Sequence, residues 1–418
     1  MSGMEGERSF PKDGTPVREM EIIRSRQDPH AGSTHENPCQ GIIASMTTPN
    51  LFTPLTLGGL ELSHRVVMPP LTRMRADAGT NTANAMMAQY YGQRATAGGF
   101  IICEASQISP DGRGIPCTPG IHSPEQIVGW KLVSDAIHAK GGHAYLQLWH
   151  MGRLSHPSHQ PGGALPIAPS AIAAAGEATT ADFRKEPFPT PRALETAEIP
   201  GLVERYAQAA RNAKAAGFDG VEIHAANGYL LEQFLQSRTN QRTDLYGGSI
   251  ENRCRVVLDI VRAISEVWGA SRVGIRLSPY GIANDSGEAD PMPLYSHLIR
   301  QLDTFGLSYL HLIEPRASGA GQKEVDHQNV PSAARLFRPM WRSRLIAAGN
   351  FRGDSANAMI SEGDADAIAF GRLFISNPDL PERLRTGAPL TPYNRATFYT
   401  RGPEGYLDYT TMSGALAG

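Results

Sequence analysis

The segment from His224 to Tyr229 (His-Ala-Ala-Asn-Gly-Tyr) brings together three polar side chains of different chemistry. His224 and Asn227 can both donate hydrogen bonds to one oxygen atom and so stabilise negative charge that develops on it. Tyr229 is a weak acid that can deliver a proton close by. The same pattern could equally be a loop histidine with satisfied hydrogen bonds beside a packing tyrosine. The elements that position the segment must decide between these interpretations.

Two glycine-containing segments near the C-terminus form a second set, Gly349-Asn350 and Phe370-Gly371-Arg372. Glycines let backbone N–H groups come close to phosphate oxygens, and an arginine provides a charged fork for them. Either glycine alone could simply make a tight turn after a strand. Together, the two segments indicate a phosphate-binding site.

Carboxylates are scarce near these segments. Only Glu104, Glu222 and Glu314 lie near the ends of apolar runs. A metal-dependent barrel enzyme needs several Asp, Glu or His side chains at such positions, and most glycosidases need a pair of carboxylates. The sequence therefore disfavours both classes, and we expect no metal site.

Short apolar runs that recur along the chain must position these residues. Each run has four to six residues without strict alternation, which is typical of a strand buried on both faces. The runs are 65–69, 100–104, 144–149, 220–224, 273–277, 308–313, 345–348 and 365–370.

Helix candidates lie between several of these runs, at 125–140, 200–216, 250–268 and 378–385. The first begins after Ser123-Pro124 and the third follows Ser249, so both carry helix start signals. Strands that alternate with helices predict an α/β fold, a single (β/α)8 TIM barrel. An open doubly wound sheet is the alternative, but it usually carries a glycine-rich phosphate loop, and G-x-G-x-x-G is absent from the chain.

A barrel places its active site at the carboxyl ends of its strands. The residues that follow the runs should therefore line one site. They are Thr72, Ala105, Gln147 with Trp149, the 224–229 segment, Arg276 and the two glycine-containing segments. The long connection after the third strand, residues 152–196, is rich in Pro, Gly, His and Ala, and we expect it to form a lid or a pocket wall.

The overall composition narrows the class of protein. The chain has 418 residues, with 39 Lys and Arg against 41 Asp and Glu, a formal net charge of −2 that disfavours nucleic acid as a partner. There is no apolar run of ~18 residues, so we expect no membrane span. The cysteines, at 39, 103, 117 and 254, form no C-x-x-C pair, which indicates reduced thiols and a cytoplasmic location.

Residues 1–47 differ from the remainder, because they are rich in Glu, Arg, Gly, Ser and Pro and have few periodic apolar positions. We expect a disordered N-terminal extension. A start codon assigned too far upstream is the alternative, since Met46 stands just before the first structured-looking segment. Residues 48–418 are then expected to form one barrel domain.

From about Leu51 to Tyr409 the chain resembles the old yellow enzyme family, which are FMN-dependent alkene reductases on a (β/α)8 barrel. Each motif is weak alone, but all occur in the family's order. They are 51–55 (LFTPL), 65–73 (RVVMPPLTR), 147–149 (QLW), 224–229 (HAANGY), 244–253 (DLYGGSIENR), 276–279 (RLSP), 349–350 (GN), 370–372 (FGR) and 398–399 (FY). The subgroup looks like the bacterial N-ethylmaleimide and nitroester reductases, with Thr72 where the thermophilic-like branch has cysteine.

The resemblance implies tightly bound, non-covalent FMN. Thr72 would bond the O4 side of the flavin, Gln147 would meet its pyrimidine edge, and Arg276 would lie beside N1 and O2, where a cation favours the reduced anion. The remaining expected FMN contacts are main-chain groups of Pro69, Pro70, Leu71 and Ala105 along the ring, and Gly349, Asn350, Gly371 and Arg372 at the phosphate.

The resemblance also implies an ene-reductase that works in two hydride transfers through flavin N5, with NADPH or NADH as donor. The acceptor would be the C=C bond of an α,β-unsaturated carbonyl or nitro compound. His224 and Asn227 would grip its activating oxygen, Tyr229 would donate the proton, and Trp149 and Tyr399 would line the substrate pocket. Small electrophilic alkenes or nitro compounds are then the partners, and the protein a monomer or homodimer.

Three alternative functions are also compatible with parts of the sequence. A dienoyl-CoA reductase or flavin amine dehydrogenase on the same fold would carry a cysteine-rich iron–sulfur segment and further domains, which the four scattered cysteines disfavour. The near-neutral charge disfavours a flavin enzyme that acts on tRNA. A barrel-shaped binding protein with an inactive site is the remaining alternative, and flavin binding would separate it from an enzyme.

Overall fold

A computed structural model describes residues 49–315 and 331–414. The expected N-terminal extension, residues 1–47, lies outside these described residues.

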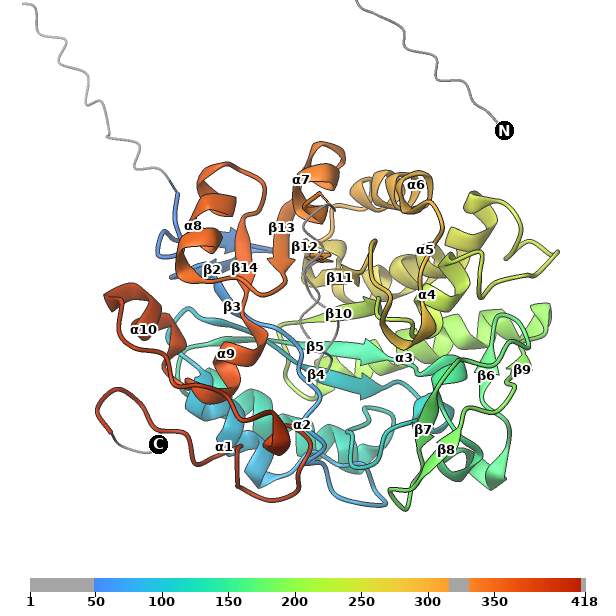
Figure 1. Ribbon diagram of the computed structural model, residues 1–418, viewed down its shortest axis with the longest axis horizontal. Coiled ribbons are helices and arrows are strands. Elements are labelled where there is room, and N and C mark those ends of the chain that lie inside the picture. The colour runs from blue at the N-terminus through green and yellow to red at the C-terminus, as the bar shows by residue number, and fades with distance from the viewer. Residues whose placement is uncertain (1–48, 316–330, 415–418) are drawn as a thin grey trace, which may run out of the picture. The chain divides into compact units, whose positions relative to one another are not determined.

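Parallel strands form a closed barrel whose order around the ring is β10-β11-β12-β13-β14-β3-β4-β5. The apolar runs predicted as strands coincide with these elements, so the predicted TIM barrel is confirmed and the open doubly wound sheet is excluded. The strands are β3 (Val66–Met68), β4 (Phe100–Gln107), β5 (His143–Trp149), β10 (Gly220–Ala225), β11 (Val273–Leu277), β12 (Tyr309–Ile313), β13 (Arg344–Ala348) and β14 (Ala367–Ala369). Helices cover the outside of the ring (Figure 1). Nearly all residues of the strands are buried, as expected for a parallel barrel whose strands are covered on both faces.

The four predicted helices are present as α2 (Pro124–His138), α3 (Ile199–Ala215), α5 (Ile250–Trp268) and α10 (Leu380–Thr386). Ser123 caps α2 in a reciprocal capping box with Gln126, and Ser249 caps α5, as their positions predict. Further helices outside the predicted set are α1 (Ala85–Arg94), α4 (Leu230–Leu235), α6 (Pro291–Asp303), α7 (Ala333–Phe337), α8 (Gly353–Ser361) and α9 (Gly371–Ser376).

The amino end of the barrel is closed by a short hairpin of β1 (Leu55–Leu57) and β2 (Leu60–Leu62). Its leucines form one apolar cluster with Phe100, Tyr145 and Tyr309. A larger cluster lies between the strands and the surrounding helices. The barrel is therefore packed at its amino end, and the cavity described below opens at its carboxyl end.

The long insertion after β5 forms small sheets. β6 (Ile167–Ala168) pairs with β9 (Arg192–Ala193), and β7 (Glu177–Thr179) pairs antiparallel with β8 (Lys185–Pro187). The β7–β8 hairpin lies beside the barrel, away from β13 and β14 (Figure 1). This segment was expected to supply a lid or pocket wall, and Thr179 and Lys185 do line the cavity described below.

No helix in residues 49–315 and 331–414 is both long enough and apolar enough to cross a membrane. The same described residues contain no group of three or more His, Cys, Asp or Glu side chains arranged to hold a metal ion.

Candidate active site

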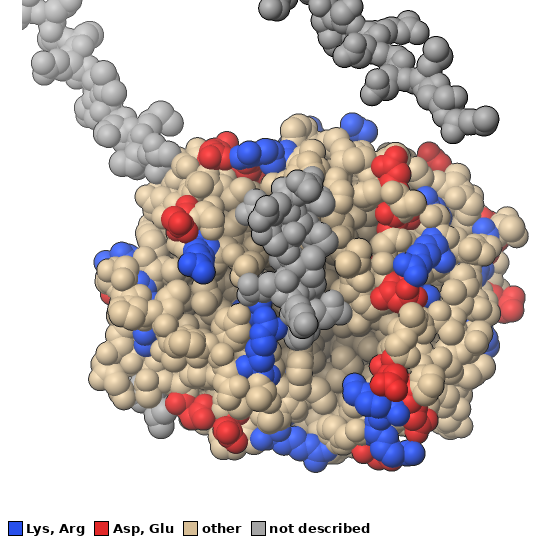
Figure 2. Space-filling view, viewed as in Figure 1, with Lys and Arg blue, Asp and Glu red and all other residues tan. Residues whose placement is uncertain are grey.

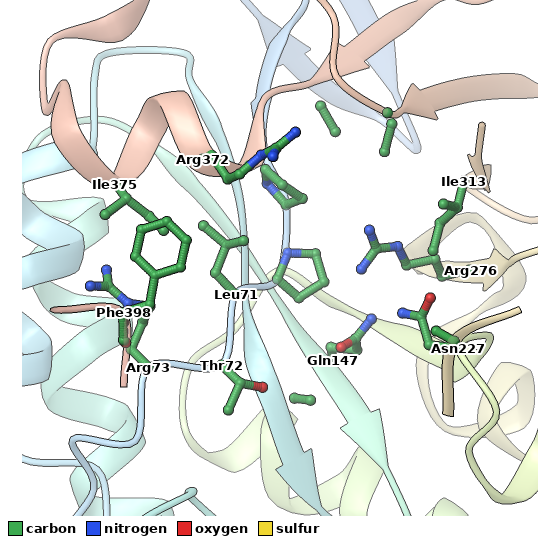
Figure 3. Close-up of a pocket in the computed structure, with 18 of the residues that line it drawn as sticks. Leu71, Thr72, Arg73, Gln147, Asn227, Arg276, Ile313, Arg372, Ile375 and Phe398 are labelled. Carbon is green, nitrogen blue, oxygen red and sulfur yellow. Dashed lines mark hydrogen bonds between the residues drawn. The ribbon is translucent and has the colours of Figure 1, made fainter. Parts of the chain in front are cut away.

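A cavity of about 740 Å³ opens at the carboxyl end of the barrel strands. Pockets for cofactors and small substrates typically measure ~300–1,000 Å³. Every site residue predicted from the sequence lies on its wall: Pro69, Pro70, Leu71, Thr72, Ala105, Gln147, Trp149, His224, Asn227, Tyr229, Arg276, Gly349, Asn350, Gly371, Arg372 and Tyr399. Figure 3 shows Arg276, Gln147 and Asn227 gathered at one side of the cavity, with Arg372 at another.

The 224–229 segment leaves the end of β10 through a backbone that L-residues rarely adopt. Asn227 has φ = +59° and Gly228 has φ = +78°, the left-handed region in which asparagine and glycine are best tolerated. This turn directs both Asn227 and Tyr229 to the cavity, and Tyr229 then begins helix α4. A strained turn at this position is typical of functional sites.

Buried side chains from other elements hold this turn. The Asn227 N–H donates to Ser278 Oγ over 2.8 Å, and Ser278 donates to Glu232 Oε1 over 2.6 Å. The other carboxylate oxygen of Glu232 accepts from the Gly228 N–H, and Tyr295 also donates to Glu232. The Glu232 carboxylate therefore braces the backbone that carries Asn227 and Tyr229.

His224 and Tyr229 stand edge to face, with ring centroids 4.9 Å apart. Burial, reinforced by Arg276 and His311, holds the pKa of His224 well below its usual value, so its imidazole is neutral and carries one N–H. Its Nδ1 makes no hydrogen bond with the described residues. Burial also raises the pKa of Tyr229, so the phenol keeps its proton at physiological pH. The neutral His224 ring can therefore donate its N–H in a hydrogen bond, whereas the Tyr229 phenol is the acid of the pair that can give its proton to a carbanion.

A buried hydrogen-bond network lies behind the part of the cavity wall that Gln147 forms. Glu222 on β10 accepts from Gln147 Nε2 over 2.7 Å and from His311 Nδ1 over 2.8 Å. The Gln147 amide is thereby oriented, and its carbonyl oxygen is left for the cavity. Arg276 pairs in register with His224 on the neighbouring strand, and its Nε makes no hydrogen bond with the described residues. An unpartnered guanidinium nitrogen in a cavity wall suits an anionic or carbonyl-bearing ligand.

The two glycine-containing segments meet at the ends of β13 and β14. Gly349 has φ = +152°, and an added Cβ would lie 2.6 Å from Cβ of Glu314, so this position admits only glycine. Asn350 adopts φ = +54°, and its side chain accepts a hydrogen bond from Arg372 Nη2 over 2.9 Å. Gly371 begins helix α9. Two glycines and a guanidinium therefore lie together at the ends of β13 and β14, and these are the residue types of the predicted phosphate site.

The C-terminal segment forms the wall above Thr72. Arg73 donates to the carbonyls of Phe398 and Gly405, and Arg75 donates to those of Thr397 and Phe398. Both guanidinium groups also lie against the Tyr406 ring. These contacts hold Phe398 and Tyr399 against the cavity, and no local sequence pattern predicts them because they join segments more than 300 residues apart.

Several further lining residues were not predicted from the sequence. Ile115, Thr179 and Lys185 come from the segments around the insertion, and Asn284 comes from the loop after β11. Asn284 donates to the Asn227 carbonyl over 2.9 Å and lies beside the Tyr229 hydroxyl. Its left-handed backbone, φ = +59°, is common for asparagine, but nothing in the sequence indicates where the side chain points.

The charged side chains that line the cavity are all basic within the described residues. Among the residues that the structure describes, five of those lining the cavity are Arg or Lys and none is Asp or Glu. A flat anionic cofactor with a phosphate tail fits such a wall, with the phosphate at Gly349 and Arg372 and the ring system toward Gln147 and Arg276. Fold and site together define a barrel oxidoreductase of the flavin-binding class.

Comparison with known proteins gives the family. Residues 50–391 match the model of the NADH:flavin oxidoreductase / NADH oxidase family. 12-Oxophytodienoate reductase 1 of Oryza sativa subsp. japonica is 45% identical over 370 residues, 88% of this chain and 94% of that protein. Flavin oxidoreductase hxnT of Emericella nidulans is 45% identical over 378 residues, 86% of this chain and 97% of that protein.

Solved structures agree. Morphinone reductase in complex with tetrahydroNAD is 48% identical, with a TM-score of 0.81 over 87% of this chain and 98% of that one. The old yellow enzyme homologue from Zymomonas mobilis is 40% identical, with a TM-score of 0.81 over 87% of this chain and 99% of that one. The chain therefore belongs to the old yellow enzyme family of FMN-dependent oxidoreductases.

Two buried carboxyl groups near the site predict an unusual pH dependence of stability. Burial raises the pKa of both Glu104 and Glu232 from 4.5 to about 7. The folded protein thus binds more protons than the unfolded chain between pH 4.5 and 7. The contribution of each group to the free energy of unfolding is fully present below pH 4.5 and is lost as the pH rises through 7. The loss is on the order of 3 kcal/mol for each group.

Glu104→Gln removes one of these titrations, and urea unfolding at pH 5 and pH 8 measures the effect. We expect the free energy of unfolding to fall less over this interval in the variant than in the wild type. Equal losses in both proteins would show that Glu104 does not titrate near neutrality.

Proposed function

We propose that the protein is an FMN-dependent ene-reductase that reduces the C=C bond of α,β-unsaturated carbonyl or nitro compounds with NADPH or NADH. The observation that carries the proposal is the neutral His224, Asn227 and protonated Tyr229 on one turn, facing a cavity whose described lining contains no carboxylate. The similar proteins named 12-oxophytodienoate reductase 1 and morphinone reductase are both called reductases, which supports the proposal.

In this proposal Gly349, Asn350, Gly371 and Arg372 hold the phosphate of FMN, and Thr72, Gln147 and Arg276 contact its ring. Main-chain groups of Pro69, Pro70, Leu71 and Ala105 line the ring. Bound FMN supplies the hydride chemistry that links the nicotinamide donor to the alkene. The fixed positive charge of Arg276 favours negative charge on a ligand beside it, and the Glu222 network keeps the Gln147 amide in one orientation.

His224 and Asn227 act on the carbonyl or nitro oxygen of the substrate. As negative charge builds on this oxygen, their N–H groups stabilise it more strongly than they stabilise the ground state, which lowers the barrier. Tyr229 holds a proton beside the same substrate and donates it to the α-carbon. Trp149 packs edge to face on Tyr229, with centroids 5.1 Å apart, and limits the phenol to one side of the cavity.

An anaerobic visible titration tests the proposal. The purified protein should show a bound-flavin spectrum, bleach on addition of NADPH or NADH, and recover the oxidised band on addition of 2-cyclohexen-1-one. A flavin that bleaches but does not recover would reject the enone substrate class. A protein that cannot be loaded with FMN at all would instead favour a binding protein with an inactive site.

Gly349→Ala tests the phosphate site independently of turnover. The added methyl group clashes with Glu314 and needs a backbone conformation that alanine avoids, so the loop must shift. We expect the dissociation constant of FMN to rise about tenfold or more, measured by quenching of free FMN fluorescence. Gly353→Ala is the matched control, because its Cβ would meet only Leu384 at 3.7 Å. Equal FMN affinity in the Gly349 variant and the wild type would contradict this placement.

A further inference from the structure

Five basic side chains line the cavity within the described residues, and four of them have a place in the proposed cofactor site or in the fold. Arg276 and Arg372 face the proposed cofactor site, Arg352 follows the Gly349-Asn350 segment at its phosphate end, and Arg73 donates to backbone carbonyls of the C-terminal segment. Lys185, the fifth, has no such place. Its Nζ donates to Thr179 Oγ1 over 2.7 Å, and within the described part of the chain it forms no ion pair with a carboxylate.

Lys185 does not belong to the phosphate end of the cavity. It lies on β8, in the insertion that follows β5, whereas the phosphate loops follow β13 and β14. β5 and β13 are four positions apart in the ring of eight, on opposite sides of the barrel. β5 is instead the direct neighbour of β10, which carries His224. Lys185 therefore approaches the cavity from the side that carries His224 and Asn227.

The β7–β8 hairpin separates its charges between two faces. Thr179 and Lys185 stand directly opposite one another in the register, and both line the cavity. The next residue, Glu186, alternates to the other face and pairs with His156 over 3.2 Å and with Arg184 over 3.1 Å. None of the hairpin carboxylates, Glu177, Asp182 and Glu186, lines the cavity, whereas the Lys185 ammonium and the Thr179 hydroxyl do.

An ammonium group with a hydroxyl beside it is a donor set for an oxyanion. Because the Thr179 oxygen already accepts from Lys185, its own proton is available to a second acceptor. Basic side chains lie on both sides of the central hollow of this face (Figure 2). A wall without described carboxylates adds an attractive field for any negatively charged ligand that enters.

We propose that Lys185 and Thr179 form an anion subsite at the substrate end of the cavity, which binds a carboxylate or phosphate carried by the reactants. The inference rests on the proposed function and deepens it. The anion has two chemical sources, an acidic group on the alkene substrate or a phosphate of the nicotinamide donor, and the two arms of the experiment separate them.

The first arm measures binding without turnover. The oxidised FMN-loaded protein is titrated by calorimetry with 4-[(E)-3-oxobut-1-enyl]benzoate and with its methyl ester, which differ by one negative charge. Lys185→Gln should raise the ratio of the acid's dissociation constant to the ester's by about three- to tenfold, and Lys185→Arg should restore the wild-type ratio. The wild-type preference for the acid should shrink with added salt, because the ammonium is exposed.

The second arm measures flavin reduction by NADPH, NADH and N-benzyl-1,4-dihydronicotinamide, which has no phosphate. If the subsite serves the donor, Lys185→Gln should weaken saturation by the two dinucleotides relative to the phosphate-free donor. The matched control is Arg184→Gln, which removes a neighbouring cation that is paired with Asp182 and Glu186. This variant should leave both ratios at the wild-type value.

A change in the acid/ester ratio assigns the subsite to the substrate, and a change in the donor ratio assigns it to the nicotinamide. If neither ratio changes in Lys185→Gln, or Arg184→Gln changes them equally, the subsite does not exist. Failure of the proposed function looks different, because the enone would then not reoxidise the flavin in the wild type. The ratio of the dissociation constants of the acid and the ester would still show whether Lys185 binds the negative charge, because it is measured without turnover.

Discussion

Replacing Tyr229 with phenylalanine should slow reoxidation of the reduced flavin by 2-cyclohexen-1-one about 10²- to 10⁴-fold, the usual contribution of a positioned general acid. Flavin reduction by NADPH or NADH should keep its wild-type rate, because that half-reaction needs no proton from the phenol. The substitution keeps the ring and therefore the edge-to-face contacts with Trp149 and His224. Only the hydroxyl, whose pKa burial raises, is removed.

Stopped-flow spectroscopy under anaerobic conditions measures the two half-reactions separately in one preparation. The reductive half-reaction thus serves as the internal control for folding and FMN content. A solvent deuterium isotope effect on the alkene step in the wild type, absent or altered in the variant, would support proton donation by Tyr229. Equal slowing of both half-reactions would show that Tyr229 has another role.

Glu232→Leu should have the second-largest effect, although Glu232 does not line the cavity. The leucine leaves the Gly228 N–H and the hydroxyls of Ser278 and Tyr295 without their acceptor in a buried place. Each loss costs about 1–3 kcal/mol, so the left-handed turn should relax. A displacement of about 1 Å at Asn227 and Tyr229 is enough to reduce the alkene half-reaction ~100-fold.

Three measurements distinguish this effect from general unfolding. Hydrogen exchange should accelerate in residues 226–236, the alkene half-reaction should slow, and the dissociation constant of FMN should change little. Glu266→Leu on α5 is the matched control, because Glu266 is exposed and the same carboxylate is lost there without buried donors. Glu232→Gln keeps an acceptor oxygen and should fall between the wild type and Glu232→Leu. Wild-type alkene kinetics in Glu232→Leu would remove the bracing role.

The barrel strands could be predicted because their signal is local. A run such as Val273–Leu277 is apolar along its whole length, and this pattern is compatible with a strand buried on both faces whatever its neighbours are. Helix α2 could be predicted for the same kind of reason, since Ser123 and Pro124 mark its start. Helix α6 lies outside the predicted set, although Asp290 and Pro291 carry the same type of start signal.

The orientation of the insertion could not be predicted from the sequence. Its composition predicts a pocket wall, but the side of the hairpin that faces the cavity follows from how β7 and β8 pair and dock on the barrel. Lys185 and Arg184 are adjacent basic residues, yet only Lys185 lines the cavity. No composition or spacing separates the two, because the difference arises from contacts between distant segments.

The sequence by itself determined the barrel, the end of it that carries the site, and the residues that leave each strand at that end. These depend on strand and helix periodicity, which acts over a few residues, and on the rule that parallel barrel strands present their carboxyl ends on one face. Only the tertiary structure decided the bracing of Asn227 by Ser278 and Glu232, the anchoring of Tyr399 through Arg73 and Arg75, and the position of Lys185. Such contacts join residues from 46 to 325 positions apart, and their energies depend on burial and geometry that only the folded chain creates.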